Sequence, residues 1–108
     1  MTQQQMDLKT MPLLALRGVV VFPGMTLHFD VARKHSISAV QAAMYQDQSI
    51  FLVAQKDLRV EEPQQDDLYS VGCIAQIKQI IKLNSDTLRV VVEGITRARL
   101  INLESSAP

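Results

Sequence analysis

The chain has 108 residues, which fits one small domain with a hydrophobic core of its own. Eleven lysine and arginine residues balance eleven aspartate and glutamate residues, so there is no basic surplus of the kind that a dedicated nucleic-acid-binding protein carries. The single cysteine, Cys73, excludes an internal disulfide and favours a reducing compartment. The chain shows neither a signal-peptide pattern nor an apolar run long enough for a membrane span, so a cytoplasmic protein is expected.

The first structured segments are expected to be two strands joined by a turn. Residues 1–10 are polar and rich in glutamine, which predicts a flexible N-terminus. Apolar runs at 13–16 and 26–31 predict the strands, and the second alternates apolar and polar residues as a half-buried strand does. Between them, Pro23 and Gly24 form a dipeptide that is a strong turn signal.

One helix is expected in the middle of the chain. Apolar residues recur at three- and four-residue spacing over about 33–46, with Ile37, Val40 and Met44 on the apolar face. Arg33 and Lys34 lie near its start, where the helix dipole disfavours positive charge, so they are either kept for a contact or form an ordinary solvated helix end.

The remaining elements are expected to be strands. A nearly continuous apolar run at 50–55 predicts a central buried strand, and 58–60 is a possible short strand before an acidic loop at 61–67. A long strand over 72–83 and a strand over 87–93 predict a hairpin, and Gly94 is expected to break or bulge the chain before a last strand at 97–103.

Side-chain alternation assigns the two faces of the long strand at 72–83. The residues expected to share the core face are Cys73, Ala75, Ile77, Ile81 and Leu83. Gln79 interrupts this apolar face, which predicts a bulge or bend midway. Together the elements predict a strand-dominated α+β domain, with five or six strands in a curled sheet or partly closed barrel around one helix.

Four segments of the chain resemble the amino-terminal domain of the ATP-dependent Lon proteases. Pro12-Leu-Leu-Ala-Leu-Arg-Gly-Val-Val-Val-Phe-Pro-Gly-Met is similar to the opening of that domain, and Val31-Ala-Arg-Lys-His-Ser to the start of its first helix. Tyr69-Ser-Val-Gly-Cys-Ile-Ala and Val92-Glu-Gly-Ile-Thr-Arg-Ala are similar to its later Val-Gly-x-x-Ala and Glu-Gly-x-x-Arg segments. One departure is Ala15, where the family usually carries proline. The resemblance implies a PUA-like β-barrel over about 11–104, with 105–108 as a linker or a truncated end.

No catalytic or metal-binding pattern emerges from the residues. The sequence has no phosphate-binding glycine motif, and no Cys-x-x-Cys or His-x-x-x-His set. Cys73 lies among apolar neighbours, as a buried core cysteine does, and His28 is expected on the exposed side of its strand. We therefore expect no catalytic residue, metal or cofactor in this chain. The resemblance implies that ATP, Mg²⁺ and the serine peptidase belong to other domains of a longer protein.

The function implied by the resemblance is recognition of unfolded or damaged polypeptides, together with assembly of protomers into an oligomer. Recognition of many sequences needs exposed apolar surface, and the candidate contact residues are Val21, Phe22, Pro23, Met25, Arg33 and Lys34. The apolar members of this set could instead cap the end of the barrel. A stand-alone Lon-like protein that self-associates, or that binds a small ligand or RNA, is the alternative. Contact with a membrane is not expected, and nucleic acid is an improbable partner.

Overall fold

The computed structural model describes residues 9–103, so most of the predicted flexible start at 1–10 and the predicted linker at 105–108 lie outside the described residues. Five strands, one α-helix and a short 3₁₀ helix follow one another along the chain. Their order is β1 (Leu13–Leu16), β2 (Thr26–Val31), α1 (Lys34–Met44), β3 (Ser49–Ala54), η1 (Gln65–Asp67), β4 (Val71–Lys82) and β5 (Leu88–Arg99). The strands predicted at 13–16 and 26–31 are confirmed with the same bounds.

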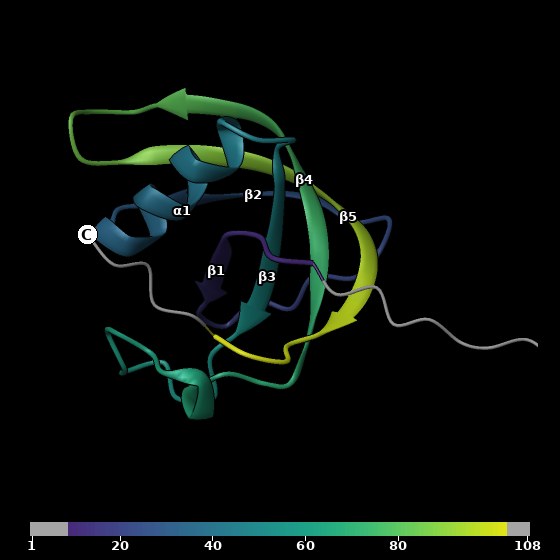
Figure 1. Ribbon diagram of the computed structural model, residues 1–108. Helices are drawn as coiled ribbons and strands as arrows, with labels where there is room; N and C mark the ends of the chain where they lie inside the picture. The colour runs from purple at the N-terminus through teal and green to yellow at the C-terminus, as the bar shows by residue number, and fades with distance from the viewer. Residues whose placement is uncertain (1–8, 104–108) are drawn as a thin grey trace, which may run out of the picture.

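The five strands form one sheet that curls on itself without closing (Figure 1). Its order is β1-β3-β4-β5-β2, with β1 parallel to β3 and every other pair antiparallel. The sheet therefore has two edges, β1 and β2, and α1 packs against β1 and β3. This architecture confirms the strand-dominated α+β fold with one main helix.

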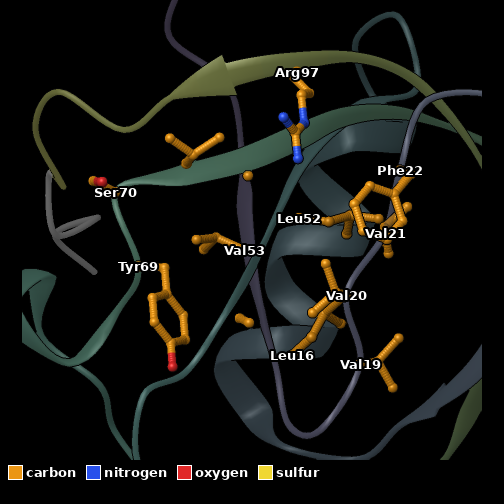
Figure 2. Close-up of a pocket in the computed structure, with 13 residues that line it drawn as sticks. Leu16, Val19, Val20, Val21, Phe22, Leu52, Val53, Tyr69, Ser70 and Arg97 are labelled. Carbon is orange, nitrogen blue, oxygen red and sulfur yellow. The ribbon is translucent and has the colours of Figure 1, made fainter.

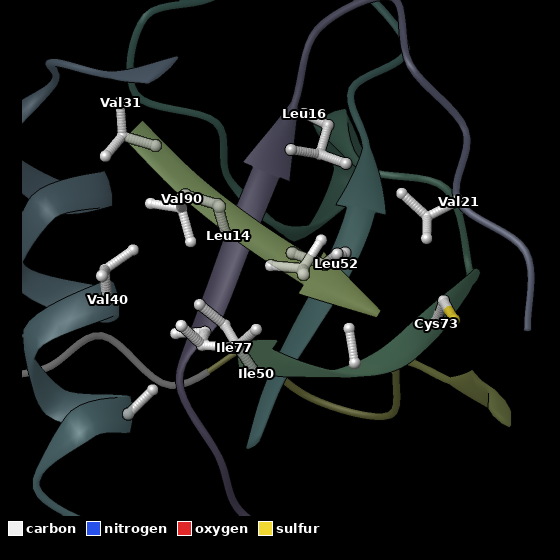
Figure 3. Close-up of a cluster of buried hydrophobic side chains, with 13 residues drawn as sticks. Leu14, Leu16, Val21, Val31, Val40, Ile50, Leu52, Cys73, Ile77 and Val90 are labelled. Atoms are coloured by element: carbon white, nitrogen blue, oxygen red, sulfur yellow. The ribbon is translucent and has the colours of Figure 1, made fainter. Parts of the chain in front are cut away.

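The main hydrophobic core lies inside the curl (Figure 3). Side chains of β1, β3 and β4 meet there, and α1 contributes Val40, which is fully buried. β3 is buried on both faces, as its apolar sequence predicts: Ile50 and Leu52 face this core. Phe51 and Val53 face a smaller cluster with Leu68 on the other side of the sheet.

The helix begins one residue later and ends two residues earlier than the predicted range. Its preceding residue, Arg33, has extended backbone and makes no side-chain cap. Val40 and Ala43 face the core, whereas Met44, which was expected on the apolar face, is 40% exposed. The expectation for Met44 was wrong because Ala43, one position earlier, occupies the last turn's contact with the sheet.

The predicted bulge in β4 exists, and it reverses the side chains that follow it. Ile77 pairs with Val92 while Gln79 pairs with Val91, so Lys78 is the extra residue. An extra residue shifts the two-residue alternation, which moves Ile80 toward the core and turns its successors outward. The prediction that Ile81 and Leu83 share the core face was therefore wrong, since they are 40% and 42% exposed.

The last strand is longer than the sequence predicts. A separate strand at 97–103 was wrong, because β5 runs through Gly94 to Arg99 and keeps its pairing with β4. The predicted irregularity at Gly94 is confirmed as a shift of register that leaves Ile95 as the extra residue. The possible strand at 58–60 was also wrong: these residues form a turn that the Gln55 side chain holds by donating from Nε2 to the Val60 carbonyl at 2.8 Å.

Candidate functional site

A tight turn shapes the loop between β1 and β2. The Met25 N–H donates to the Phe22 carbonyl at 3.1 Å, which closes a four-residue turn with Pro23 and Gly24 at its centre. Gly24 has φ of 88°, the conformation that glycine adopts readily at the third position of a type II turn. The predicted Pro-Gly turn is thereby confirmed.

The same loop is tied to β5 through backbone atoms. The Gly24 N–H donates to the Gly94 carbonyl and the Gly94 N–H donates to the Met25 carbonyl, both at 2.8 Å. A Cβ atom on Gly94 would stand 2.4 Å from the Phe22 carbonyl oxygen, closer than real Cβ atoms come to any neighbour. Glycine at position 94 thus allows the loop to approach the bulge of β5.

The apolar side chains of this loop point alternately inward and outward. Val21 is buried in the main core, whereas Val20 and Phe22 are 59% and 47% exposed. Pro23 is also exposed, and Met25 is 37% exposed while its Sδ lies 3.2 Å from the Phe22 nitrogen. The loop therefore both caps the core, through Val21, and presents apolar surface, through its neighbours.

A hollow of about 320 Å³ opens beside the loop, at one end of the curled sheet; we call it the end groove (Figure 2). Its walls come from the loop on one side and the start of β4 on the other, with the end of β3 between them. The exposed large apolar side chains of its lining are Val20, Phe22, Tyr69 and Val71, and Arg97 also belongs to the lining. Tyr69 and Val71 are 51% and 44% exposed, so both walls of the end groove are apolar and accessible.

Arg97 provides the only charged side chain of this lining. Arg97 lies on β5, where it pairs with Cys73 of β4. Its guanidinium carbon lies 5.7 Å from the centre of the Phe22 ring. At this distance a cation is attracted by the face of an aromatic ring. The end groove therefore combines apolar walls with one positive charge.

The sequence-based candidates do not all meet at this place. Phe22 and Val21 line the end groove, whereas Arg33 and Lys34 do not. Arg33 instead donates at 3.0 Å to the carbonyl of Ala15 and, also at 3.0 Å, to that of Glu61. Burial, together with the nearby positive charge of Arg17, lowers the pKa of Arg33.

Sequence reasoning missed Val20, Tyr69 and Arg97. Each belongs to a different segment, and only the curl of the sheet brings the segments together. The one local signal was the unbroken apolar run from Val19 to Phe22. A strand between Gly18 and Pro23 would be so short that some of these side chains are expected to face solvent or a partner.

The titratable and nucleophilic side chains form no reactive cluster in the described part of the chain. Cys73 is fully buried, as predicted, and burial raises the pKa of its thiol. His28 and His35 are both exposed, and Nε2 of His35 lies 3.5 Å from an exposed carboxylate oxygen of Glu62. Between residues 9 and 103, no three His, Cys, Asp or Glu side chains gather closely enough to hold a metal ion. No helix in this range has the length and apolarity needed to cross a membrane.

Sequence comparison places most of the chain in one family. Residues 10–108 match the family described as "ATP-dependent protease La (LON) substrate-binding domain". The chain is 47% identical over 102 residues to the Lon protease of Desulforamulus reducens, and 54% identical over 92 residues to that of Clostridium acetobutylicum. These alignments cover 94% and 85% of the chain but only 13% and 12% of the relatives, so the chain spans about an eighth of their length.

Solved structures agree with this placement. The N-terminal domain of the Mycobacterium avium complex Lon protease is 26% identical, with a TM-score of 0.70 over 93% of this chain and 49% of that one. A Lon N-terminal domain protein from Xanthomonas campestris shares the fold, with a TM-score of 0.65 over 85% of this chain and 49% of that chain, at 18% identity. The resemblance seen in the four sequence segments is thus confirmed: the chain belongs to the family of Lon protease substrate-binding domains.

Proposed function

We propose that this domain helps an ATP-dependent, Lon-type serine endopeptidase to recognise unfolded or damaged proteins, and that the end groove is where it contacts them. The parent enzyme would bind ATP and Mg²⁺ in a separate motor domain and act in the cytoplasm. The observation that carries the proposal is the set of exposed large apolar side chains, Val20, Phe22, Tyr69 and Val71, around one hollow. Apolar surface gathered in this way is typical of an interaction site.

The physical properties of the end groove suit a partner of variable sequence. Its volume of about 320 Å³ lies at the small end of the range for ligand pockets in proteins. Burying one large apolar side chain contributes about 1.5–3 kcal/mol, so a single site binds weakly. Weak binding that depends on apolar area rather than on precise polar contacts tolerates many sequences, as selection of damaged proteins requires.

The experiment is chemical-shift mapping of the 108-residue chain with a reduced and alkylated protein that cannot fold. The expected result is a cluster of shift changes at 19–22, 69–72 and Arg97, with binding weakened in Phe22→Ser. Tyr45→Ser is the matched control, because Tyr45 is an aromatic residue that is 92% exposed and does not line the groove. Shift changes that gather elsewhere, or equal effects of the two substitutions, would disprove this role for the end groove.

Self-association of protomers is a second candidate function. Exposed apolar residues also occur far from the end groove, on the β4–β5 hairpin at Ile81 and Leu83. The net charge of zero removes the repulsion that would keep copies apart. Sedimentation of the chain and of an Ile81→Lys variant tests this candidate: a concentration-dependent mass that the substitution abolishes supports it, and a strictly monomeric chain contradicts it for the isolated domain.

A further inference from the structure

Resting on the proposed function, we propose that the end groove prefers extended polypeptide segments in which an aspartate or glutamate lies two positions from a large apolar residue. The apolar residue would lie between the two walls, and the carboxylate two positions away would pair with Arg97. The inference adds a charge preference to a site that would otherwise select only for apolar character.

The charge of the end groove supports the first step. Its lining contains one arginine and no aspartate or glutamate. Within the described range 9–103, the guanidinium of Arg97 takes part in no ion pair and donates no hydrogen bond. Two other arginines of the fold do have such partners: Arg59 pairs with Asp57 at 3.1 Å, and Arg89 pairs with Asp30 at 2.9 Å. Arg99 has no such partner among residues 9–103 either, but it does not line the groove.

The position of Arg97 supports the second step. Arg97 projects from β5 toward the hollow, with Phe22 and Leu52 on one side and Val53 and Tyr69 farther along the groove (Figure 2). Phe22 attracts the guanidinium to the mouth of the groove through its ring. A guanidinium held by a ring face still offers several N–H donors, and a carboxylate can accept two of them at once. The charged group thus lies beside the apolar walls in the structure without a partner.

A partner side chain that enters the apolar walls and a carboxylate that reaches Arg97 must point to the same side of the partner. Successive side chains of an extended segment point to opposite sides, so residues two positions apart share one side and lie about 6.6 Å apart along the chain. When one residue inserts between the walls, its direct neighbour points away from the groove, and the residue two positions along points to the side where Arg97 lies. Lysine or arginine at that second position would meet a like charge and is disfavoured.

The test measures binding of short fluorescent peptides that share one apolar sequence and differ only in the residue two positions after a central phenylalanine, which is Glu, Gln or Lys. The unmodified chain is expected to bind the Glu peptide about two- to fivefold more tightly than the Gln peptide, which is the range for a partly exposed ion pair. The Lys peptide should bind most weakly. Higher ionic strength should reduce these differences, because salt screens exposed charges.

Variants of the domain separate the charge from the apolar contact. Arg97→Gln should bind the Glu and Gln peptides equally, and Arg97→Glu should prefer the Lys peptide. Lys82→Gln makes the same change of charge at the far end of the β4–β5 hairpin and should keep the original preference. The amide spectrum of each variant checks that the fold is kept.

The outcomes distinguish this inference from the proposed function. Equal binding of all three peptides at the end groove, in the unmodified chain, would overturn the carboxylate preference while leaving apolar recognition in place. Absence of binding at the groove by every peptide would overturn both. A preference for the Glu peptide that persists in Arg97→Glu would also overturn the inference, because a group other than Arg97 would then bind the carboxylate.

Discussion

Gly94 shows how a single residue decides where the β1–β2 loop lies. Its backbone exchanges two hydrogen bonds with the turn at Gly24 and Met25, and its missing side chain leaves space for the Phe22 carbonyl. A glycine can be required because it adopts positive φ or because another backbone comes close, and Gly94 is of the second kind. Gly18 is of the first kind, since its φ is 72° and nothing lies within 4 Å of the position of a Cβ.

These two glycines give a matched prediction. Gly94→Ala should push the loop off β5 and cost about 2–3 kcal/mol of unfolding free energy, because a backbone atom cannot make way cheaply. Gly18→Ala should cost about 1 kcal/mol from its positive φ alone and leave the turn in place. Urea unfolding gives the free energies, and amide shifts at 22–25 report the loop. Wild-type shifts at those residues in Gly94→Ala would contradict the close approach.

Asp30 and Arg89 link the edge strand β2 to β5. The Arg89 Nε donates to Oδ1 of Asp30 at 2.9 Å, and this hydrogen bond lowers the pKa of Asp30 below its ordinary 3.8. A carboxyl whose pKa is lower in the folded chain stabilises the fold above its ordinary pKa. That contribution disappears as the pH falls through the folded value.

Asp30→Asn should therefore melt at a lower temperature than the unmodified chain at neutral pH. The difference between the two melting temperatures should shrink below pH 3.8 as the wild-type carboxyl becomes protonated. Asp86→Asn, in the turn between β4 and β5, is the control, since no ion pair of Asp86 is found among residues 9–103. Calorimetry across the pH range makes the comparison, and a difference that stays constant to low pH would refute the assignment.

Among the elements, β4 shows how far side-chain alternation in the sequence predicts which residues face the core. Its range, its partner β5 and a bulge near Gln79 could all be predicted, because alternation and turn residues are local signals. The consequence of the bulge could not, since the sequence does not say whether Lys78 or a neighbour is the extra residue. That single choice decides which of Ile80 and Ile81 faces the core. At Gly94 the sequence left a break and a bulge as alternatives, and pairing with β4 continues β5 through this residue as a bulge.

Adjacent isoleucines allow a direct test of the bulge. Ile80→Ala should lower the unfolding free energy by about 1–2 kcal/mol, because Ile80 packs against the core. Ile81→Ala should change it by less than about 0.5 kcal/mol, since Ile81 is 40% exposed. The same substitution in neighbouring strand positions keeps the intrinsic strand preference matched. Equal losses in chemical denaturation would mean that the alternation is not reversed at Lys78.

Across the whole molecule, the end groove depends on the curl of the sheet rather than on any one segment. The strand order brings β3, β4, β5 and the β1–β2 loop to one end, although they lie far apart in the sequence. The exposed character of Phe22 could be suspected from its place in a short apolar run. The contribution of Arg97 could not, because its partner Phe22 lies 75 positions earlier (97 − 22) and no local pattern links them.

Arg33 joins three parts of the fold at the β1 edge of the sheet. The N–H of Phe51 in β3 donates to the Pro12 carbonyl, and the N–H of Gln55, directly after β3, donates to the Leu16 carbonyl. Carbonyls alternate in direction along a strand, so the Ala15 carbonyl points away from β3. Arg33 precedes α1 and donates to that outward carbonyl, and also to Glu61 in the loop after β3. The positive charge at the helix start, which the helix dipole disfavours, is therefore kept for a contact within the molecule.

Replacing Arg33 should thus destabilise the whole domain, whereas replacing its neighbour should not. Arg33→Met keeps the apolar part of the side chain but removes both hydrogen bonds, and should lower the unfolding free energy by about 2 kcal/mol. Lys34→Met is the matched control: Lys34 is exposed, and the change should stay within about 0.5 kcal/mol. Urea denaturation measures both variants, and amide exchange at β1 and 57–61 shows whether the two segments loosen together. If the variants prove equally stable, Arg33 does not hold the helix, the edge strand and the loop together.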